Sequence, residues 1–195
     1  MPSRRAFVAG SIALAAFPAG AAKTPPPPKV GAIYWPGAGH TLHGYMAIPA
    51  KAHGPQPAVL VLPGTNGADR FALGLTDALA LAGFVACVPK APLLLDDGVA
   101  TLRWLATNRY ATGKVATVGV AEGAALVERL SASSDARLSC GVIFGDGAGM
   151  ADAGIPMLRL PAMASANDPA AYMAAWREAV LFLSGQLQPQ AKGRP

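Results

Sequence analysis

The sequence predicts an α/β protein with a mostly parallel β-sheet that is covered by helices on both faces. Two observations support this prediction. Apolar, strand-like runs alternate along the chain with segments whose apolar residues have helical spacing, which is the pattern of a sheet with crossover helices. The run from Val59 to Leu62 is also apolar at every position, as expected for a strand that is buried on both faces.

Length and composition are those of one globular domain. The chain has 195 residues, of which 52% are hydrophobic, and this is ample for a core. Its 22 glycines and 18 prolines predict many short turns. The basic residues behind the formal charge of +5 are scattered, so we expect no nucleic-acid partner. We expect a single domain over residues 30–187 and a disordered tail over residues 188–195.

The first 22 residues resemble an export signal. Arg4 and Arg5 precede an apolar run that is too short to span a hydrocarbon layer of about 30 Å, and small residues at 19–22 offer a cleavage site. The twin arginine resembles the signal of the bacterial twin-arginine route, which implies export in a folded state. The alternative is an uncleaved N-terminal anchor. With cleavage, we expect a periplasmic or secreted protein without membrane attachment, and a stiff Pro-rich spacer over residues 23–29.

The expected elements follow one another in chain order. Two strand-like runs on either side of Pro36-Gly37-Ala38-Gly39 indicate an edge hairpin. Gly83 is a plausible C-terminal cap of the first helix, and acidic residues begin the second helix, where the helix dipole favours them. Further strands are expected at 57–64, 84–89, 114–120, 139–145 and 161–167. Helices are expected at 70–82, 96–108, 122–133 and 170–187.

These segments and their spacing resemble the dienelactone hydrolase family of α/β-hydrolases, from about Gly44 to Leu187. The resemblance is carried by HGYMAIPAKAHGPQPAVLVLPG, ALALAGFVACVPK, DDGVATLRWLATN and KVATVGVAEGAAL. It implies the α/β-hydrolase fold, with a mostly parallel doubly wound sheet and an antiparallel N-terminal hairpin. It also implies hydrolysis of esters or lactones by a Cys or Ser nucleophile with an Asp and a His, and it implies no cofactor.

The segment from Lys114 to Leu126 is typical of a nucleophile elbow, the strained strand-to-helix turn that presents a catalytic Ser or Cys between two glycines. Gly119 and Gly123 are in place, but Ala121 occupies the nucleophile position and has no nucleophilic atom. The alternative is an ordinary Gly-containing turn. The agreement in spacing along the whole chain favours a retained elbow.

The other two triad members are also in question. Asp168 stands where the resemblance places the acid, but it equally fits a helix N-cap before a proline. Asp146 is a weaker candidate. No histidine follows His53, and the chain runs from Asp168 straight into the last helix, without the His-bearing strand and loop of the family. We expect His40 and His43 at the surface, with too few further ligands for a metal site.

Backbone donors can outlast catalytic side chains. An oxyanion hole at this elbow would use the N–H of Glu122 and the loop after the first central strand. An inward-facing Glu122 carboxylate would disfavour anionic substrates. The Gly-rich run from residue 145 lacks the context of a nucleotide loop and is expected at the pocket rim. The expected binding residues are Gly64, Thr65, Asn66, Glu122 and Asp146.

Three functions remain open from the sequence. The first is an exported, catalytically degenerate hydrolase whose pocket binds a small ester, lactone, carbonyl or carboxylate compound. The second is an ester or lactone hydrolase with unconventional residues, drawn from Glu122, Asp146, Asp168 and Ser165. The third is a structural or partner-binding protein. The absence of both nucleophile and base favours the first.

The two cysteines, Cys87 and Cys140, lie in apolar strand-like runs. In the sheet order that the resemblance implies, two central strands separate them, at about 4.8 Å per strand step. This exceeds the limit of about 7 Å between Cα atoms of a disulfide. We therefore expect two buried free thiols.

Overall fold

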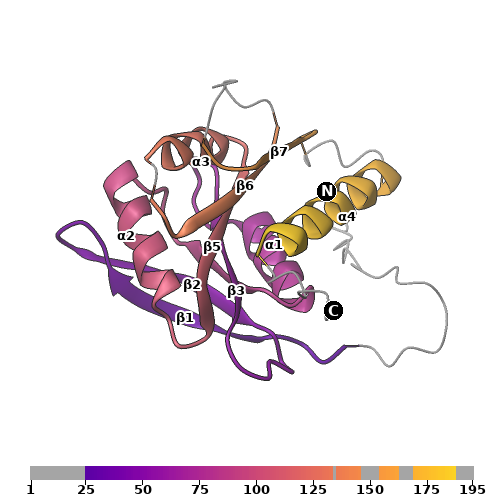
Figure 1. Cartoon of the computed structure of the whole chain (residues 1–195), viewed down its shortest axis with the longest axis horizontal. Helices are drawn as coiled ribbons and strands as arrows, with labels where there is room; N and C mark the ends of the chain where they lie inside the picture. The colour runs from indigo at the N-terminus through magenta and orange to yellow at the C-terminus, as the bar shows by residue number, and fades with distance from the viewer. Residues whose placement is uncertain (1–24, 134, 146–153, 163–168, 188–195) are drawn as a thin grey trace, which may run out of the picture.

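The structure is a computed structural model of the chain and describes residues 25–133, 135–145, 154–162 and 169–187. A seven-stranded sheet lies between helices on both of its faces, which gives three layers (Figure 1). The strands are β1 (Lys29–Pro36), β2 (Thr41–Ile48), β3 (Gln56–Leu62), β4 (Val85–Pro89), β5 (Ala111–Val120), β6 (Leu138–Phe144) and β7 (Met157–Leu160). The helices are α1 (Arg70–Leu81), α2 (Leu95–Ala106), α3 (Gly123–Ala132) and α4 (Pro169–Leu187).

The sheet is mixed and mostly parallel, with the strand order β1-β2-β4-β3-β5-β6-β7. The strands from β3 to β7 pair in parallel, whereas β2 is antiparallel to both β1 and β4. The expected fold class and the expected antiparallel N-terminal hairpin are therefore confirmed. Both follow from the short turn after Pro36, which allows only an antiparallel return, and from the helices between later strands, which allow parallel pairing.

Two hydrophobic clusters, one on each face of the sheet, form the core. One face packs against α1 and α4, and the other packs against α2 and α3. In β3 every residue from Ala58 to Leu62 is at most 1% exposed, which explains why this strand is apolar at successive positions. Within the described ranges, no helix has the length and apolar character needed to cross a membrane.

The hairpin at the sheet edge is anchored to α2 by buried polar groups. The Trp35 Nε1–H donates to Thr101 Oγ1 at 2.9 Å, and the Thr101 hydroxyl donates to the Asp97 carbonyl at 2.7 Å. The Asp97 carboxylate accepts the N–H of Ala38, in the hairpin turn, at 2.9 Å. Asp97, expected only as a favourable charge at the start of the helix, therefore also fixes the hairpin turn.

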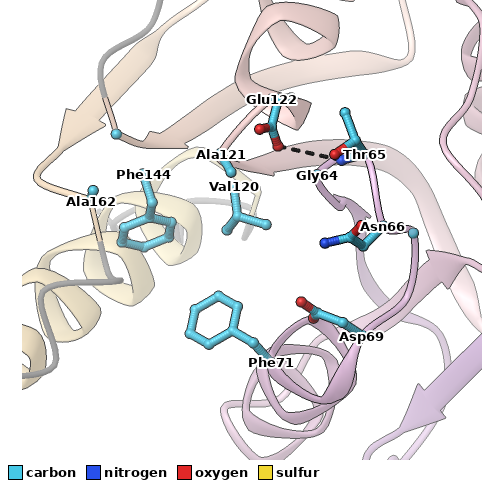
Figure 2. A pocket seen from close by; sticks show the side chains of 12 residues that line it. Gly64, Thr65, Asn66, Asp69, Phe71, Val120, Ala121, Glu122, Phe144 and Ala162 are labelled. Atoms are coloured by element: carbon cyan, nitrogen blue, oxygen red, sulfur yellow. Dashed lines mark hydrogen bonds between the residues drawn. The ribbon is translucent and has the colours of Figure 1, made fainter.

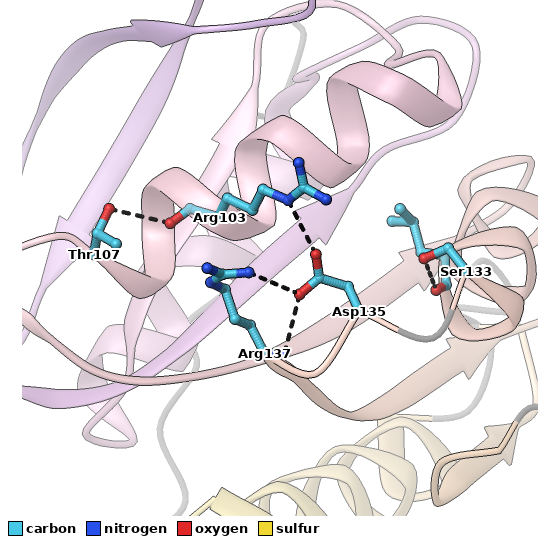
Figure 3. A network of polar contacts seen from close by, with 6 residues as sticks. Arg103, Thr107, Ser133, Asp135 and Arg137 are labelled. Carbon is cyan, nitrogen blue, oxygen red and sulfur yellow. Dashed lines mark hydrogen bonds and ion pairs between the residues drawn. The ribbon is translucent and has the colours of Figure 1, made fainter.

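A second polar network holds the connection between α3 and β6 against α2 (Figure 3). The Asp135 carboxylate accepts Arg103 Nε–H at 3.2 Å, and it accepts the backbone N–H of Arg137 at 3.0 Å. Burial raises the pKa of Asp135, but the hydrogen bonds from Arg137 and Arg103 outweigh it, so the pKa lies below its ordinary value. The carboxylate form is thus stabilised in the folded protein.

The position of the last expected strand was wrong. We expected it at 161–167, but β7 ends at Leu160, and residues 163–167 lie outside the described part of the chain. A charged residue obscured the pattern, because Arg159 lies within β7. Its Nη1–H donates to the Glu128 carboxylate of α3 at 2.8 Å, and that side chain is 4% exposed. Leu160, the next residue, is buried in the core.

The prediction of two free cysteines is confirmed. Cys87 lies in β4 and Cys140 in β6, with β3 and β5 between them, and both are free and buried. Burial raises the pKa of the Cys140 thiol to about 12 and raises that of Cys87 still further. Both thiols therefore act as small apolar groups of the core.

Candidate functional site

The turn between β5 and α3 is the geometric centre of the site. Ala121 has a φ of 49°, and it is the one residue other than glycine with positive φ in the described ranges. This left-handed conformation costs an L-residue about 1–2 kcal/mol. An ordinary strand-to-helix turn does not require it, so the prediction that Ala121 keeps the elbow conformation is confirmed.

The two flanking glycines explain why the chain adopts this turn. A Cβ at Gly123 would overlap the backbone oxygen of Leu62 and lie 2.7 Å from its carbonyl carbon. A Cβ at Gly119 would lie 2.7 Å from Val127 Cγ2. The absence of side chains at these two positions lets the first turn of α3 pack directly on β3 and β5. The backbone at residue 121 is thereby forced into a sharp bend.

A pocket of about 740 Å³ opens beside the elbow (Figure 2). It lies beyond the carboxyl ends of β3, β5 and β6, which is where open α/β sheets place their ligand sites. Its walls come from the loop after β3, the elbow, the end of β6 with Gly145, Ala162 after β7, and the start of α1. Segments that are far apart in the sequence therefore meet at one edge of the sheet.

The Glu122 side chain turns toward the loop after β3. Its Oε2 accepts the backbone N–H of Thr65 at 3.3 Å, as the dashed line in Figure 2 shows. Gly64 makes room for this carboxylate, because a Cβ there would lie 2.5 Å from Oε2. The Thr65 N–H is one of the donors that an oxyanion hole would use. In this structure the Thr65 N–H already donates to the Glu122 carboxylate.

The chemistry of the pocket lining is acidic and aromatic. Asp69 and Glu122 supply two carboxylates, and within the described part of the chain the lining holds no Lys, Arg or His. Phe71, which is 39% exposed, and Phe144, which is 1% exposed, also line the pocket (Figure 2). Asp69 also caps α1, since its Oδ1 accepts the N–H of Ala72 at 2.8 Å.

The structure brings together most of the residues that the sequence singled out. The pocket lining includes Gly64, Thr65, Asn66, Ala121 and Glu122. Asp146 and Asp168 lie outside the described residues, so their positions at the site stay predictions.

The expected surface histidines do not reach the pocket. His40 and His43 are exposed on the hairpin, and His40 Nε2 lies 3.5 Å from the Asp97 carboxylate. His53 is exposed in the loop between β2 and β3. In the ranges that the structure describes, no group of three or more His, Cys, Asp or Glu residues could hold a metal ion.

Sequence reasoning missed several lining residues, among them Asp69, Phe71 and Phe144. A signal was present for Phe144, because the last residue of a central strand borders the ligand edge of such a sheet. Asp69 and Phe71 carried no such signal. In the sequence they are only a helix cap and an apolar residue of the first helical turn.

No protein-family model and no curated protein sequence matches the chain. Solved structures do match. One is a dienelactone hydrolase-like promiscuous phosphotriesterase from metagenomic libraries, with 16% identity, a TM-score of 0.67, and coverage of 83% of this chain and 100% of that chain. Dienelactone hydrolase from Anabaena variabilis matches at 14% identity and a TM-score of 0.64, over 83% of this chain and 99% of the other. A putative dienelactone hydrolase from Klebsiella pneumoniae matches at 18% identity, TM-score 0.56, over 81% and 83% of the two chains.

The class of protein that these findings define is one with an α/β-hydrolase fold, built on the sheet and N-terminal hairpin described above. Its structural neighbours are dienelactone hydrolase-like proteins. At such identities the likeness shows the fold and leaves the chemistry to be argued from the site.

Proposed function

We propose that this protein is a catalytically degenerate α/β hydrolase that binds a small molecule beside Ala121 without hydrolysing it. The observation that carries the proposal is the elbow: the strained geometry at Ala121 is kept, while the side chain offers no nucleophile. A retained pocket of about 740 Å³ falls in the size range of small-molecule sites, about 300–1,000 Å³. A pocket and an elbow without a nucleophile fit binding better than turnover.

The ligand classes expected from the sequence are not equally compatible with the site. A carboxylate placed at the oxyanion position would meet the Glu122 carboxylate, which already accepts the Thr65 N–H. Two negative charges at neighbouring positions repel each other, and this repulsion disfavours a bound carboxylate. A neutral carbonyl compound avoids this repulsion. We therefore retain a carbonyl ligand without a negative charge in the proposal and disfavour a carboxylate.

One observation favours a second candidate, an ester or lactone hydrolase of unconventional mechanism. Glu122 brings a carboxylate to the elbow, and a carboxylate can act as a general base toward water. The same carboxylate engages the donor that would stabilise the oxyanion of the tetrahedral intermediate, which opposes catalysis. The two candidates differ in measurable turnover.

The test is steady-state hydrolysis of an activated ester and a dienelactone by the wild-type protein, Ala121→Cys and Ala162→Cys. We expect no protein to reach an ordinary enzyme rate of about 1 s⁻¹. The Ala121→Cys thiol should at most be acylated once, because triad members act as a unit and no histidine of the described chain lies at the pocket. Ala162→Cys is the matched control, since it adds a thiol to the same lining away from the elbow.

Wild-type turnover at about 1 s⁻¹ or faster would refute the proposal of a catalytically degenerate hydrolase and would favour Glu122 as the general base. Turnover by Ala121→Cys alone would mean that a base serves the elbow after all. A thermal-shift series with lactones and esters then tests binding, since a true ligand raises the Tm in proportion to the logarithm of its concentration.

A further inference from the structure

We propose that the pocket selects a small organic cation, an amine or a quaternary ammonium group attached to an apolar body. This inference rests on the proposed function in one respect, namely that the ligand occupies the pocket beside Ala121. It goes further by assigning the charge of the ligand. Three features of the lining support it: its charge, the incomplete pairing of the Glu122 carboxylate, and the exposed ring of Phe71.

The charge of the lining opposes the charge of the chain. The whole sequence carries a formal +5, with 16 basic and 11 acidic residues, yet the described lining has two carboxylates and no basic side chain. Arg70 lies between Asp69 and Phe71 in the sequence but is not part of the lining. A concave site lined by charges of one sign focuses their field and attracts ligands of the other sign.

The Glu122 carboxylate lacks a cationic partner within the protein. Among the described residues its one hydrogen bond is the 3.3 Å contact from the Thr65 N–H, and it forms no ion pair. Two acidic side chains that are at most 5% exposed are paired instead: Glu128 meets Arg159, and Asp135 meets two arginines, whereas Glu122 is exposed. A ligand ammonium group at the elbow would supply the missing charge and could donate to the free oxygen.

An exposed aromatic ring supplies the rest of the recognition. Phe71, at the start of α1, lines the pocket (Figure 2), whereas Phe144 of β6 borders it but is 1% exposed and packs in the core. Phe71 is 39% exposed, so part of its ring is open to a ligand in the pocket. Aromatic faces attract a cation within about 6 Å, and they also pack against an apolar body. An uncharged or anionic ligand could pack against the ring but could not pair with the carboxylates.

Three probes of equal size separate the charge classes: protonated phenethylamine, neutral 2-phenylethanol and anionic phenylacetate. Calorimetry at pH 7 in low salt should give the tightest binding for the amine, about tenfold tighter than the alcohol, and the weakest for phenylacetate. Raising the salt concentration should weaken the binding of the amine and leave the binding of the alcohol unchanged, because salt screens partly exposed charges.

Charge-neutralising variants locate the effect. Glu122→Gln should weaken amine binding by about fivefold or more while changing alcohol binding less than twofold. Asp69→Asn should act in the same direction and keep α1 intact, since Asn is an equally good N-cap. Glu178→Gln is the matched control: it removes one negative charge from an exposed position of α4, outside the lining, and should change nothing. Circular dichroism checks that each variant is folded.

Binding of the alcohol or phenylacetate as tight as that of the amine would overturn the inference, as would no amine binding up to 10 mM (about the weakest affinity that such a site could usefully have). Equal loss of affinity in Glu178→Gln would also overturn it, because the attraction would then be non-local. The proposed function fails separately, through ester turnover by the wild-type protein. Binding of a neutral lactone without a preference for the amine would be consistent with the proposed function. It would refute only the inferred preference for a cationic ligand.

Discussion

At Ala121 the backbone is strained although the side chain performs no chemistry. In an active elbow the strain presents a nucleophile, so its persistence here needs another cause. The contacts at Gly119 and Gly123 provide one, because they fix how closely α3 approaches β3 and β5. The packing of the helix therefore dictates the φ of residue 121, and the side chain at that position does not.

If packing imposes the left-handed backbone, Ala121→Gly should stabilise the protein. Glycine adopts positive φ without a Cβ penalty, so we expect a gain of about 1 kcal/mol in the free energy of unfolding. Urea denaturation measures the gain. Ala125→Gly, at an exposed helical position of α3, is the matched control and should instead lose about 0.5–1 kcal/mol. Equal losses in both variants would mean that residue 121 is unstrained.

The complementary prediction concerns Gly123→Ala. The new Cβ would collide with the Leu62 carbonyl group, which is backbone and cannot move aside without shifting β3. We expect a loss of about 2 kcal/mol or more, as is typical of overpacked cores. Gly74→Ala is the control, because no atom lies within 4 Å of its added Cβ in α1, and it should stabilise by about 0.5–1 kcal/mol. Both values come from the same denaturation experiment.

At the scale of elements, polar side chains fix how the connections are placed on the sheet. Asp97 holds the hairpin turn against α2, and Asp135 joins α2 to the start of β6. Glu128 and Arg159 tie the short edge strand β7 to α3. These contacts connect segments that the hydrophobic clusters alone would leave free to slide. They are therefore expected to control local order more than the overall fold.

The Asp135 network predicts a pH dependence. The pKa of Asp135 is lower in the folded protein than in the unfolded chain, so it contributes stability above its ordinary pKa of about 3.9. That contribution is lost as the pH falls through the lower, folded-state value. Asp135→Asn should therefore be less stable than wild type at pH 7, with the difference shrinking below about pH 4.

Thermal unfolding between pH 7 and pH 3 checks this prediction. The control is Glu178→Gln, because Glu178 is exposed in the interior of α4 and has no ion pair among the described contacts. Its effect should be small at every pH, since a surface carboxylate without a partner contributes little. A pH-independent loss in Asp135→Asn would attribute the effect to packing instead of charge.

At the scale of the whole molecule, we propose that the protein is exported by a route for folded proteins. The proposal rests on the twin arginine and the short apolar run in residues 1–22. Mass spectrometry of periplasmic protein should find a mature N-terminus near Lys23. Arg4→Lys with Arg5→Lys should retain the precursor in the cytoplasm, whereas the charge-matched pair Lys51→Arg with Lys114→Arg should not. An intact Met1 in the membrane fraction would contradict cleavage.

The sequence by itself determined the fold class, the helices and the elbow. These depend on signals that are local in the chain: apolar runs such as Ala58–Leu62, the cap at Gly83 with its φ of 101°, and glycines two residues on either side of Ala121. The sequence also separated Cys87 from Cys140, through the strand order that the family resemblance implied. It misplaced the last strand, because four residues with a charge among them, Met157–Leu160, carry almost no periodic pattern.

Only the tertiary structure decided the chemistry of the pocket. The contact between Thr65 and Glu122 joins residues 57 positions apart, and Phe71 of α1 lines the same pocket as Phe144 of β6. Which side chains converge depends on how far each strand extends and on how each helix packs on the sheet. Strand length and helix packing depend on many weak, long-range contacts, so no single segment of the sequence encodes them. The elbow could be recognised in the sequence because its strain is local, whereas the acidic, aromatic lining exists only where distant segments meet.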